Sequence, residues 1–344
     1  MKKLFTATAL LLALLMPLAL KWHLQKKRTL FVYMWSDYIK TSLLREFEKR
    51  YNCRVIVDTY DSNESMYTKL KLGGGGYDVI FPSNYFLDLM IEQEMLSPVP
   101  ALQNATQIDQ SLLNRFNLPP TKWAVPYMVS FSGIAWRKDL IKKPPLSWGA
   151  FGRSRFKGRM TMLNDPRETI GAALRFLGFS ANTTSKEQIT QARNLLCLWK
   201  KEIAKLESEQ YKNGIASAEY LLAHAYNGDA LQLHEDNEQI QFTYPKEGSL
   251  VSVDYAAILK TSSDPELAAL FIDFLHEPAV AKENILFTNY RCINKGAREM
   301  LPEHIQNSLF LFPELDHNNT FECLHNVGPA RKLYLEAWDI VRAN

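Results

Sequence analysis

The sequence lacks the motifs that identify the common enzyme families. It contains no Gly-x-Ser-x-Gly elbow, no Gly-x4-Gly-Lys-Ser/Thr phosphate loop and no His-Glu-x-x-His pair. The run Gly73–Gly76 has no Lys-Ser/Thr continuation, so we interpret it as a flexible end to the preceding helix. Asp165 and Glu168 could form an acid–base pair, but no nucleophile lies near them in the sequence, which favours recognition of a charged ligand. We therefore predict a binding protein with no catalytic residues and no cofactor.

Cysteine is scarce, and the four cysteines are far apart. Cys53, Cys197, Cys292 and Cys323 form no Cys-x-x-Cys pair, so the sequence gives little support for a structural zinc site. Cys53 and Cys197 stand in apolar surroundings and are predicted to be packed thiols. Cys292 and Cys323 could form a disulfide, but sequence alone does not fix that pairing.

The sequence also lacks an excess of charge of either sign. Its formal net charge is +3, and Lys2 and Lys3 supply two of those charges. Without them the balance is close to neutral, which argues against a nucleic acid or an anionic surface as partner.

The N-terminus has the pattern of an export signal. Lys2 and Lys3 precede the apolar run Leu4–Leu20, which ends in the polar segment KWHLQKKR. No small-x-small cleavage site and no lipid-accepting cysteine follow, so the run could also remain as a short membrane anchor. We predict that the protein is exported to the periplasm, with residues 1–20 as a signal peptide or N-terminal anchor.

The first segment after this leader alternates between strand and helix patterns. Leu30–Met34, Val55–Thr59 and Tyr77–Phe81 are short apolar runs that predict strands, and Thr41–Arg50 and Asn63–Leu72 have helical spacing. Such alternation predicts parallel strands, whose ligand sites lie beyond their carboxyl ends. There the sequence places the aromatic, hydroxyl and acidic residues of the segments Trp35–Tyr38, Asp61–Glu64 and Ser83–Tyr85, which suit a small organic cation.

The rest of the chain predicts a second α/β unit and a return to the first. Predicted strands are Trp123–Tyr127, Phe131–Trp136, Met160–Leu163, Leu231–Leu233, Ile240–Tyr244 and Tyr255–Leu259, and predicted helices are Leu87–Glu94, Glu168–Phe179, Lys186–Leu206, Asp264–Leu275 and Arg331–Asn344. A chain of 344 residues exceeds the size of a single core, so two lobes are expected. We predict lobe 1 over 28–130 with a return at about 256–298, and lobe 2 over 131–255 with a return at about 299–344.

Several of these segments carry a family pattern. The segments YMWSDYI, DTYDSNESMYTKL, YDVIFPSNYFLDLM, VPYMVSFSGIA, NDPRETIGAALRFLGFSANTT and YPKEG closely resemble those of the periplasmic spermidine/putrescine-binding proteins, the solute receptors of polyamine ABC transporters. The resemblance runs from about residue 29 to the C-terminus. It implies an α/β fold of the two-lobed, type II periplasmic binding protein class. In this fold each lobe is a mixed, mostly parallel sheet flanked by helices, a hinge joins the lobes, and the ligand binds in the cleft between them.

The resemblance also implies a set of ligand-binding residues. Carried over one by one, they are Trp35, Ser36, Tyr38, Ser83, Tyr85, Asp165, Glu168, Tyr226, Asp254 and Tyr290. Independently of the family, an alkyl polyamine needs carboxylates for its ammonium groups and flat apolar surfaces for its methylene chains. Aromatic rings supply that surface together with a cation–π attraction of about 0.5–2 kcal/mol each.

Three positions depart from the family pattern. Tyr226 stands where the family has a tryptophan, and Ser252 replaces another tryptophan two residues before Asp254. Leu324 aligns with a glutamine near the C-terminus. The resemblance thus implies an intact site for ammonium groups with fewer aromatic and polar contacts around it.

Other interpretations of these residues remain open. Trp35 and Tyr38 could cap the core at strand ends, Asp165 and Ser83 could cap the helices that follow them, and Tyr226 could be a core residue. The leading hypothesis is a monomeric, exported receptor that captures a polyamine and delivers it to the membrane permease of an ABC transporter. The alternatives are the same clamp with a different cationic solute or a metal such as a tyrosine-bound ferric ion, and a membrane-anchored sensor or interaction protein.

Overall fold

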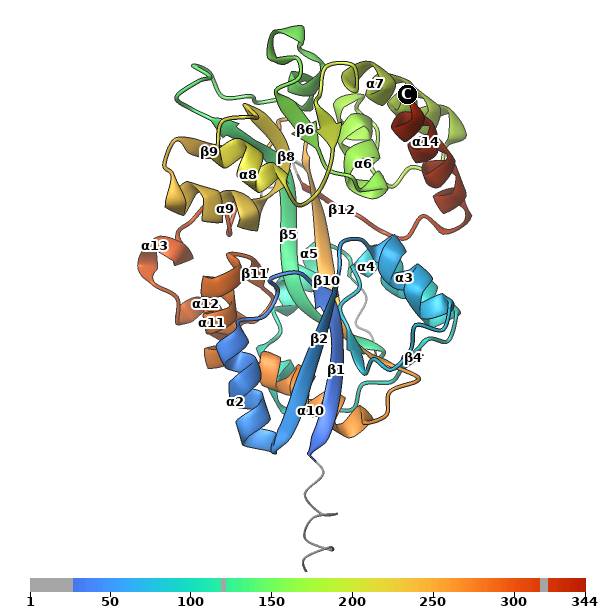
Figure 1. Cartoon of the computed structure of the whole chain (residues 1–344), viewed down its shortest axis with the longest axis vertical. Helices are drawn as coiled ribbons and strands as arrows, with labels where there is room; N and C mark the ends of the chain where they lie inside the picture. Colours follow the sequence, from blue (N-terminus) through green and yellow to red (C-terminus); the bar gives the residue numbers. More distant parts are fainter. Residues whose placement is uncertain (1–26, 119–121, 316–320) are drawn as a thin grey trace, which may run out of the picture.

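The chain forms two α/β lobes joined by long strands (Figure 1). The structure is a computed structural model, and it describes residues 27–118, 122–315 and 321–344. The predicted leader, residues 1–20, lies outside the described residues. Within the described ranges, no helix combines the length and apolar character needed to cross a membrane.

The elements follow one another in the alternating order that the sequence predicts. The strands are β1 (Arg28–Trp35), β2 (Cys53–Tyr60), β3 (Val79–Ile80), β4 (Leu96–Ser97), β5 (Ala124–Arg137), β6 (Met160–Met162), β7 (Lys205–Leu206), β8 (Leu222–Tyr226), β9 (Ile240–Thr243), β10 (Ser249–Leu259), β11 (Arg291–Cys292) and β12 (Phe321–Cys323). The helices are α2 (Thr41–Tyr51), α3 (Asn63–Lys71), α4 (Asn84–Glu92), α5 (Gln110–Arg115), α6 (Pro166–Phe176), α7 (Lys186–Trp199), α8 (Tyr211–Ala216), α9 (Asn227–Asp236), α10 (Pro265–Leu275), α11 (Pro278–Thr288), α12 (Lys295–Glu299), α13 (Glu303–Gln306) and α14 (Arg331–Ala343).

The lower lobe in Figure 1 is built on a mixed sheet. β1 pairs in parallel with both β2 and β3, as the strand–helix alternation predicts, and β10 continues the sheet antiparallel to β3. The parallel arrangement brings the carboxyl ends of β1 and β3 to the same edge, which faces the other lobe. This edge therefore carries the residues that follow Trp35 and Phe81.

The upper lobe repeats the same kind of layering. β8 pairs antiparallel with β5 and parallel with β6, and β6 pairs in parallel with β7. Helices α6, α7 and α14 cover one side of this sheet, and α8 and α9 lie toward the other (Figure 1). Asp165 is the N-cap of α6, which was one of its open interpretations: its side chain accepts hydrogen bonds from the first-turn backbone, and Pro166 occupies the first helical position.

Two long strands, β5 and β10, connect the lobes. The first half of β5 pairs with β10 in the lower lobe, and its second half pairs with β8 and β9 in the upper lobe. The prediction of two separate strands, Trp123–Tyr127 and Phe131–Trp136, was wrong, because β5 runs without a break from Ala124 to Arg137. Pro126 is accommodated where the ladder shifts register between Asp254 and Tyr255, and the Tyr255 N–H donates to the Pro82 carbonyl instead.

Two further sequence predictions were wrong. The segment Leu231–Leu233 lies in helix α9 and not in a strand, because so short an apolar run fits either period and here it packs as a helix face. The helix predicted over Lys186–Leu206 ends at Trp199, and a turn leads into the short strand β7. Neither error moves a predicted ligand-binding residue.

Most buried side chains form separate cores in the two lobes, and a small cluster of Tyr85, Phe86, Ala181, Leu250 and Leu324 packs residues of both lobes together. The lower core contains residues from β1 to the first half of β5, from β10 to α13, and Cys323. The upper core contains residues from the second half of β5 to β8, together with Val327 and helix α14. We retain the predicted lobe boundaries as a proposal, with the final return to the upper lobe placed near residue 327, because Leu301, Ile305 and Phe312 pack in the lower core.

Candidate functional site

A cleft of about 120 Å³ lies where the two lobes meet. Its lining residues come from both lobes and from the connecting strands. They are Trp35, Ser36, Asp37, Tyr38, Asp61, Ser83, Tyr85, Ser130, Asp165, Ser208, Glu209, Lys212, Tyr226, Asp229, Gln232, Ser252, Asp254, Thr288 and Tyr290. Nine of the ten predicted ligand-binding residues are among them, and Glu168 is the exception.

The carboxylate of Asp254 is fixed at the centre of this lining by two hydroxyl groups. The Tyr38 hydroxyl donates to Oδ2 at 2.5 Å, and the Ser83 hydroxyl donates to Oδ1 at 2.6 Å. Asp254 pairs with Met128 of β5 on one side and forms an isolated bridge with Ser83 on the other, directly before the point where the β10–β5 register shifts. Burial raises the pKa of Asp254 to about 6 against the opposing effect of the two hydrogen bonds.

Ser83 precedes α4 but does not use its side chain as a cap. The N-terminus of that helix has no side-chain cap hydrogen bond, because the Ser83 hydroxyl is committed to Asp254. Asn63 supports the arrangement from α3, donating to Ser83 Oγ at 3.1 Å and to the Tyr85 hydroxyl at 2.9 Å. The helix-cap interpretation of Ser83 therefore does not describe its side chain.

A second carboxylate, that of Asp165, approaches the cleft from the upper lobe. Its Oδ1 accepts the backbone N–H groups of Arg167 and Glu168 at 2.8 and 3.0 Å, and its Oδ2 accepts from the Tyr85 hydroxyl at 3.4 Å. One oxygen thus caps α6 and the other faces the lower lobe. Burial raises the pKa of Asp165, and the two backbone hydrogen bonds oppose that rise.

Glu168 lies behind the cleft lining, only 1% exposed. Ser252, which does line the cleft, donates to Glu168 Oε1 at 3.0 Å, whereas Oε2 has no hydrogen-bond partner among the described residues. Burial, followed by the neighbouring charge of Asp165, raises the pKa of Glu168 to about 7. The serine that replaces the family's tryptophan therefore binds a buried carboxylate here.

Aromatic side chains surround these acids. The Trp35 indole donates to the Phe81 carbonyl at 3.0 Å and packs against Tyr60 with ring centroids 4.6 Å apart. Tyr85 and Tyr226 lie in range of Asp165, whose charge contributes, after burial, to raising the pKa of both hydroxyls well above its usual value. The rings leave flat apolar surface between carboxylates, which suits the methylene chain of an organic cation.

The cleft also contains, around Asp229, residues that the sequence analysis missed. The Tyr290 hydroxyl donates to Asp229 Oδ1 at 3.0 Å, and the Tyr211 hydroxyl donates to Oδ2. Lys212 Nζ lies 4.0 Å from Asp229 Oδ1, and Glu209 also lines the cleft here. Apart from the position of Asp229 just after Tyr226, no local pattern distinguished these residues, because they come together only through the packing of α8 against α9.

The remaining acidic residues of the lining that were missed lie at the carboxyl ends of β1 and β2. Asp37 and Asp61 line the cleft, and both stand in segments whose acidic residues already suggested a cation site. Leu324, in contrast, is fully buried and not part of the lining, and its carbonyl accepts from the Asn84 side chain. No group of three or more histidine, cysteine or acidic side chains capable of holding a metal occurs in the part of the chain that the structure describes.

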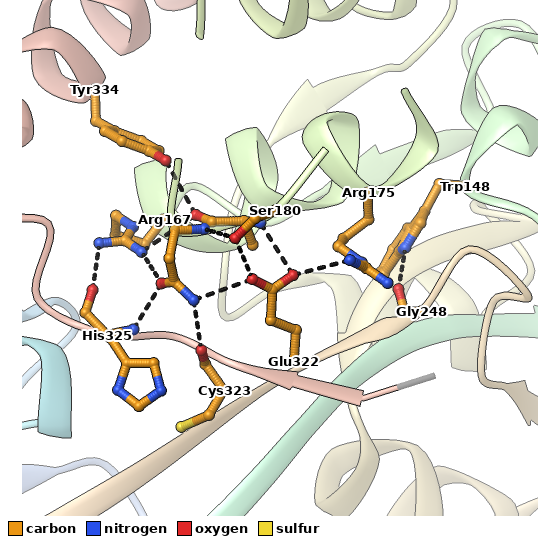
Figure 2. Close-up of polar contacts among 11 residues, drawn as sticks. Trp148, Arg167, Arg175, Ser180, Gly248, Glu322, Cys323, His325 and Tyr334 are labelled. Atoms are coloured by element: carbon orange, nitrogen blue, oxygen red, sulfur yellow. Dashed lines mark hydrogen bonds and ion pairs between the residues drawn. The ribbon is translucent and has the colours of Figure 1, made fainter. Parts of the chain in front are cut away.

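The guanidinium of Arg167 forms its hydrogen bonds with groups other than its sequence neighbours Asp165 and Glu168. It donates to the His325 carbonyl and to Asn182 Oδ1, both at 2.9 Å, and lies over the Tyr334 ring (Figure 2). Glu322 on β12 completes the network as an acceptor from Arg175 at 3.0 Å. These contacts hold helix α6, and with it Asp165, against the segment that contains Glu322 and His325.

All four cysteines are free thiols in the structure. Cys292 and Cys323, for which the sequence left a disulfide open, are both buried. Cys292 Sγ accepts from the Asn294 N–H, and Cys323 Sγ accepts from the Asn84 amide. Both thiols are therefore part of local hydrogen-bonded packing.

The two-lobed fold with an acidic, aromatic cleft at the lobe junction defines the class of solute receptors. The family described as bacterial extracellular solute-binding protein matches residues 42–309. The chain belongs to that family, which confirms the predictions of a type II periplasmic binding protein fold and of a receptor rather than an enzyme.

Individual relatives agree with this assignment. The chain is 32% identical over 93% of its length to the spermidine/putrescine-binding periplasmic protein of Escherichia coli, of which it covers 93%. It is 28% identical over 88% of its length to a putrescine/cadaverine-binding protein of Pseudomonas aeruginosa, of which it covers 90%. Among solved structures, the TpPotD lipoprotein of Treponema pallidum superimposes with a TM-score of 0.82 at 30% identity, covering 92% of this chain and 100% of that one.

Proposed function

We propose that this protein is a periplasmic receptor that captures a polyamine of the spermidine/putrescine class in the cleft and delivers it to an ABC permease. The observation that carries the proposal is the Asp254 carboxylate, held by Tyr38 and Ser83 in a cleft that also contains Asp165. The names of the Escherichia coli and Pseudomonas aeruginosa relatives support the same ligand class.

The chemistry of the cleft fits an alkyl polyamine better than a compact cation. Two carboxylates from opposite lobes, Asp254 and Asp165, can each accept a charged hydrogen bond from an ammonium group. The rings of Trp35, Tyr85 and Tyr226 offer flat surface for the carbon chain between them. Because burial disfavours both ionised carboxyl groups, a bound dication compensates a cost that the unliganded cleft bears.

The proposed ligand-binding residues are the predicted ten, with Glu168 acting from behind the lining through Ser252. Asp37, Asp61, Glu209 and Asp229 add negative charge around the cleft and attract a polycation. Closure of the lobes about β5 and β10 would bring the ligand-binding residues of the lower lobe and those of the upper lobe together around the ligand.

The direct test is isothermal titration calorimetry of the purified protein with putrescine and with spermidine. We expect saturable binding of at least one amine, and no binding of arginine or of 4-aminobutyrate at the same concentrations. Absence of heat with both amines at millimolar concentration would refute the proposal. Mass spectrometry of small molecules released from the denatured protein identifies a competing ligand in that case.

A further inference from the structure

The described lining of the cleft contains one cation, Lys212, among six carboxylates. Lys212 lies in the first turn of α8, and its Nζ is 4.0 Å from Oδ1 of Asp229 on α9. The Lys212 side chain is 30% exposed and that of Asp229 is 13% exposed. A lysine at this position repels a polycationic ligand.

The Asp229 carboxylate is arranged like that of Asp254. Two tyrosine hydroxyls, those of Tyr211 and Tyr290, donate to its two oxygens, as Tyr38 and Ser83 do for Asp254. Tyr290 also lies within electrostatic range of Asp254. The cleft therefore contains a third oriented carboxylate besides Asp254 and Asp165, and a lysine of the protein already lies beside it.

Resting on the proposed function, we infer that Lys212 is a specificity-determining residue that takes the place of a third ligand ammonium at Asp229. Asp254 and Asp165 remain available to two ammonium groups, so the cleft favours a diamine over a triamine. A triamine would bring its additional ammonium close to the Lys212 ammonium, and two like charges in a partly buried cleft repel.

Lys212 is unsuited to the opposite role of binding a ligand carboxylate. Two carboxylates lie near the Lys212 ammonium, since Asp229 Oδ1 is 4.0 Å from Nζ and Glu209 is within electrostatic range. Glu209 in turn lies in range of Asp61 and Asp37. A ligand anion would meet a net negative environment. The charge balance thus favours a counter-ion within the protein over an anion-binding group.

The test compares Lys212→Met with the unchanged protein by calorimetry, using putrescine and spermidine as probes. We expect the ratio of spermidine affinity to putrescine affinity to rise by about tenfold or more, as expected for removal of a like charge at close range. Lys212→Arg keeps the charge and should leave the ratio within about twofold of its original value. The matched control is Lys205→Met, since Lys205 is an exposed lysine of the same lobe that does not line the cleft.

Asp229→Asn tests the same inference through the opposite change in the affinity ratio. This test remains possible if Lys212→Met does not fold. The Asn substitution leaves the Lys212 charge uncompensated, so the spermidine-to-putrescine ratio should fall, and the double variant should reverse that fall.

An unchanged ratio in Lys212→Met, with both amines still bound, overturns the inference and leaves the proposed function intact. Binding of 4-aminobutyrate that disappears in Lys212→Met also overturns it, because Lys212 would then hold an anion. If neither amine binds the unchanged protein, the proposed function fails and the inference fails with it.

Discussion

Replacing Asp254 by Asn separates the role of this carboxylate in binding from its effect on folding. Asn has the same shape and can still accept a hydrogen bond from Tyr38 or Ser83, but it removes the charge. Loss of a charged hydrogen bond to a ligand ammonium costs about 1.5–3 kcal/mol, so affinity for putrescine should fall roughly 10- to 150-fold.

The unliganded protein should respond in the opposite sense. Burial raises the pKa of Asp254 from 3.8 to about 6, so ionisation costs stability, and the unliganded protein loses stability as the pH rises from about 4 through about 6. Asn resembles the neutral acid and should remove that loss, which makes the variant more stable at pH 7 by about 1–3 kcal/mol.

The two effects are measured on one preparation. Denaturant unfolding at pH 7 without ligand gives the stability change, and calorimetry at pH 5 and pH 7 gives the affinity and its pH dependence. Because a bound cation favours the ionised carboxyl, affinity of the unchanged protein should fall below about pH 6, and the variant should lose part of that dependence. Asp339→Asn, on the exposed surface of α14, is the control.

A variant that is less stable than the unchanged protein and binds putrescine with the original affinity refutes the reasoning, because Asp254 would then be a structural residue outside the site.

Two other substitutions test residues around the cleft. Glu168→Gln should stabilise the unliganded protein at pH 8 by about 1–3 kcal/mol. Burial raises the pKa of Glu168 from 4.5 to about 7, so the unchanged protein loses stability as the pH rises through that range, and the neutral Gln avoids this loss. Denaturant unfolding at pH 5 and pH 8 checks this, and a loss of stability at pH 8 would show that the Ser252 hydrogen bond needs the charge. Gly228→Ala would place a Cβ 2.7 Å from the Tyr290 ring and 2.8 Å from the Asn289 carbonyl, so it should destabilise the fold by about 1–3 kcal/mol and weaken amine binding. Gly75→Ala, whose Cβ meets nothing closer than 3.9 Å, is the control, and equal effects of the two substitutions would contradict the argument.

The strands and helices of the first lobe show which elements can be predicted from sequence periodicity alone. The strands around Leu30 and Val55 and the helix at Thr41 were placed correctly because each has the period of its element and polar residues at its ends. The short run Leu231–Leu233 was assigned the wrong period, because three apolar residues fit a strand and a helix equally well. The two strands predicted at Trp123–Tyr127 and Phe131–Trp136 form one strand, β5, in which Tyr127 is the extra residue where the register with β10 shifts.

Some of the cleft residues could be predicted from the sequence and others could not. Tyr38 and Ser83 could be predicted because they follow strands whose carboxyl ends share an edge, and the family resemblance added the acids of the other lobe. Lys212 and Asp229 could not, because α8 and α9 place them together through packing that no local period records. Their pairing changes the charge that the cleft offers to a ligand.

The sequence by itself determined the alternating elements of each lobe and the chemical character of the residues at the strand ends, because periodicity and composition are local properties. Only the tertiary structure decided which of those residues meet. The Tyr38 hydroxyl reaches Asp254, 216 positions later in the chain, because β10 returns antiparallel beside β3 and Asp254 bridges to Ser83 just beyond that strand. Contacts of that kind depend on strand pairing between distant segments, and the same pairing holds the two lobes together at the cleft.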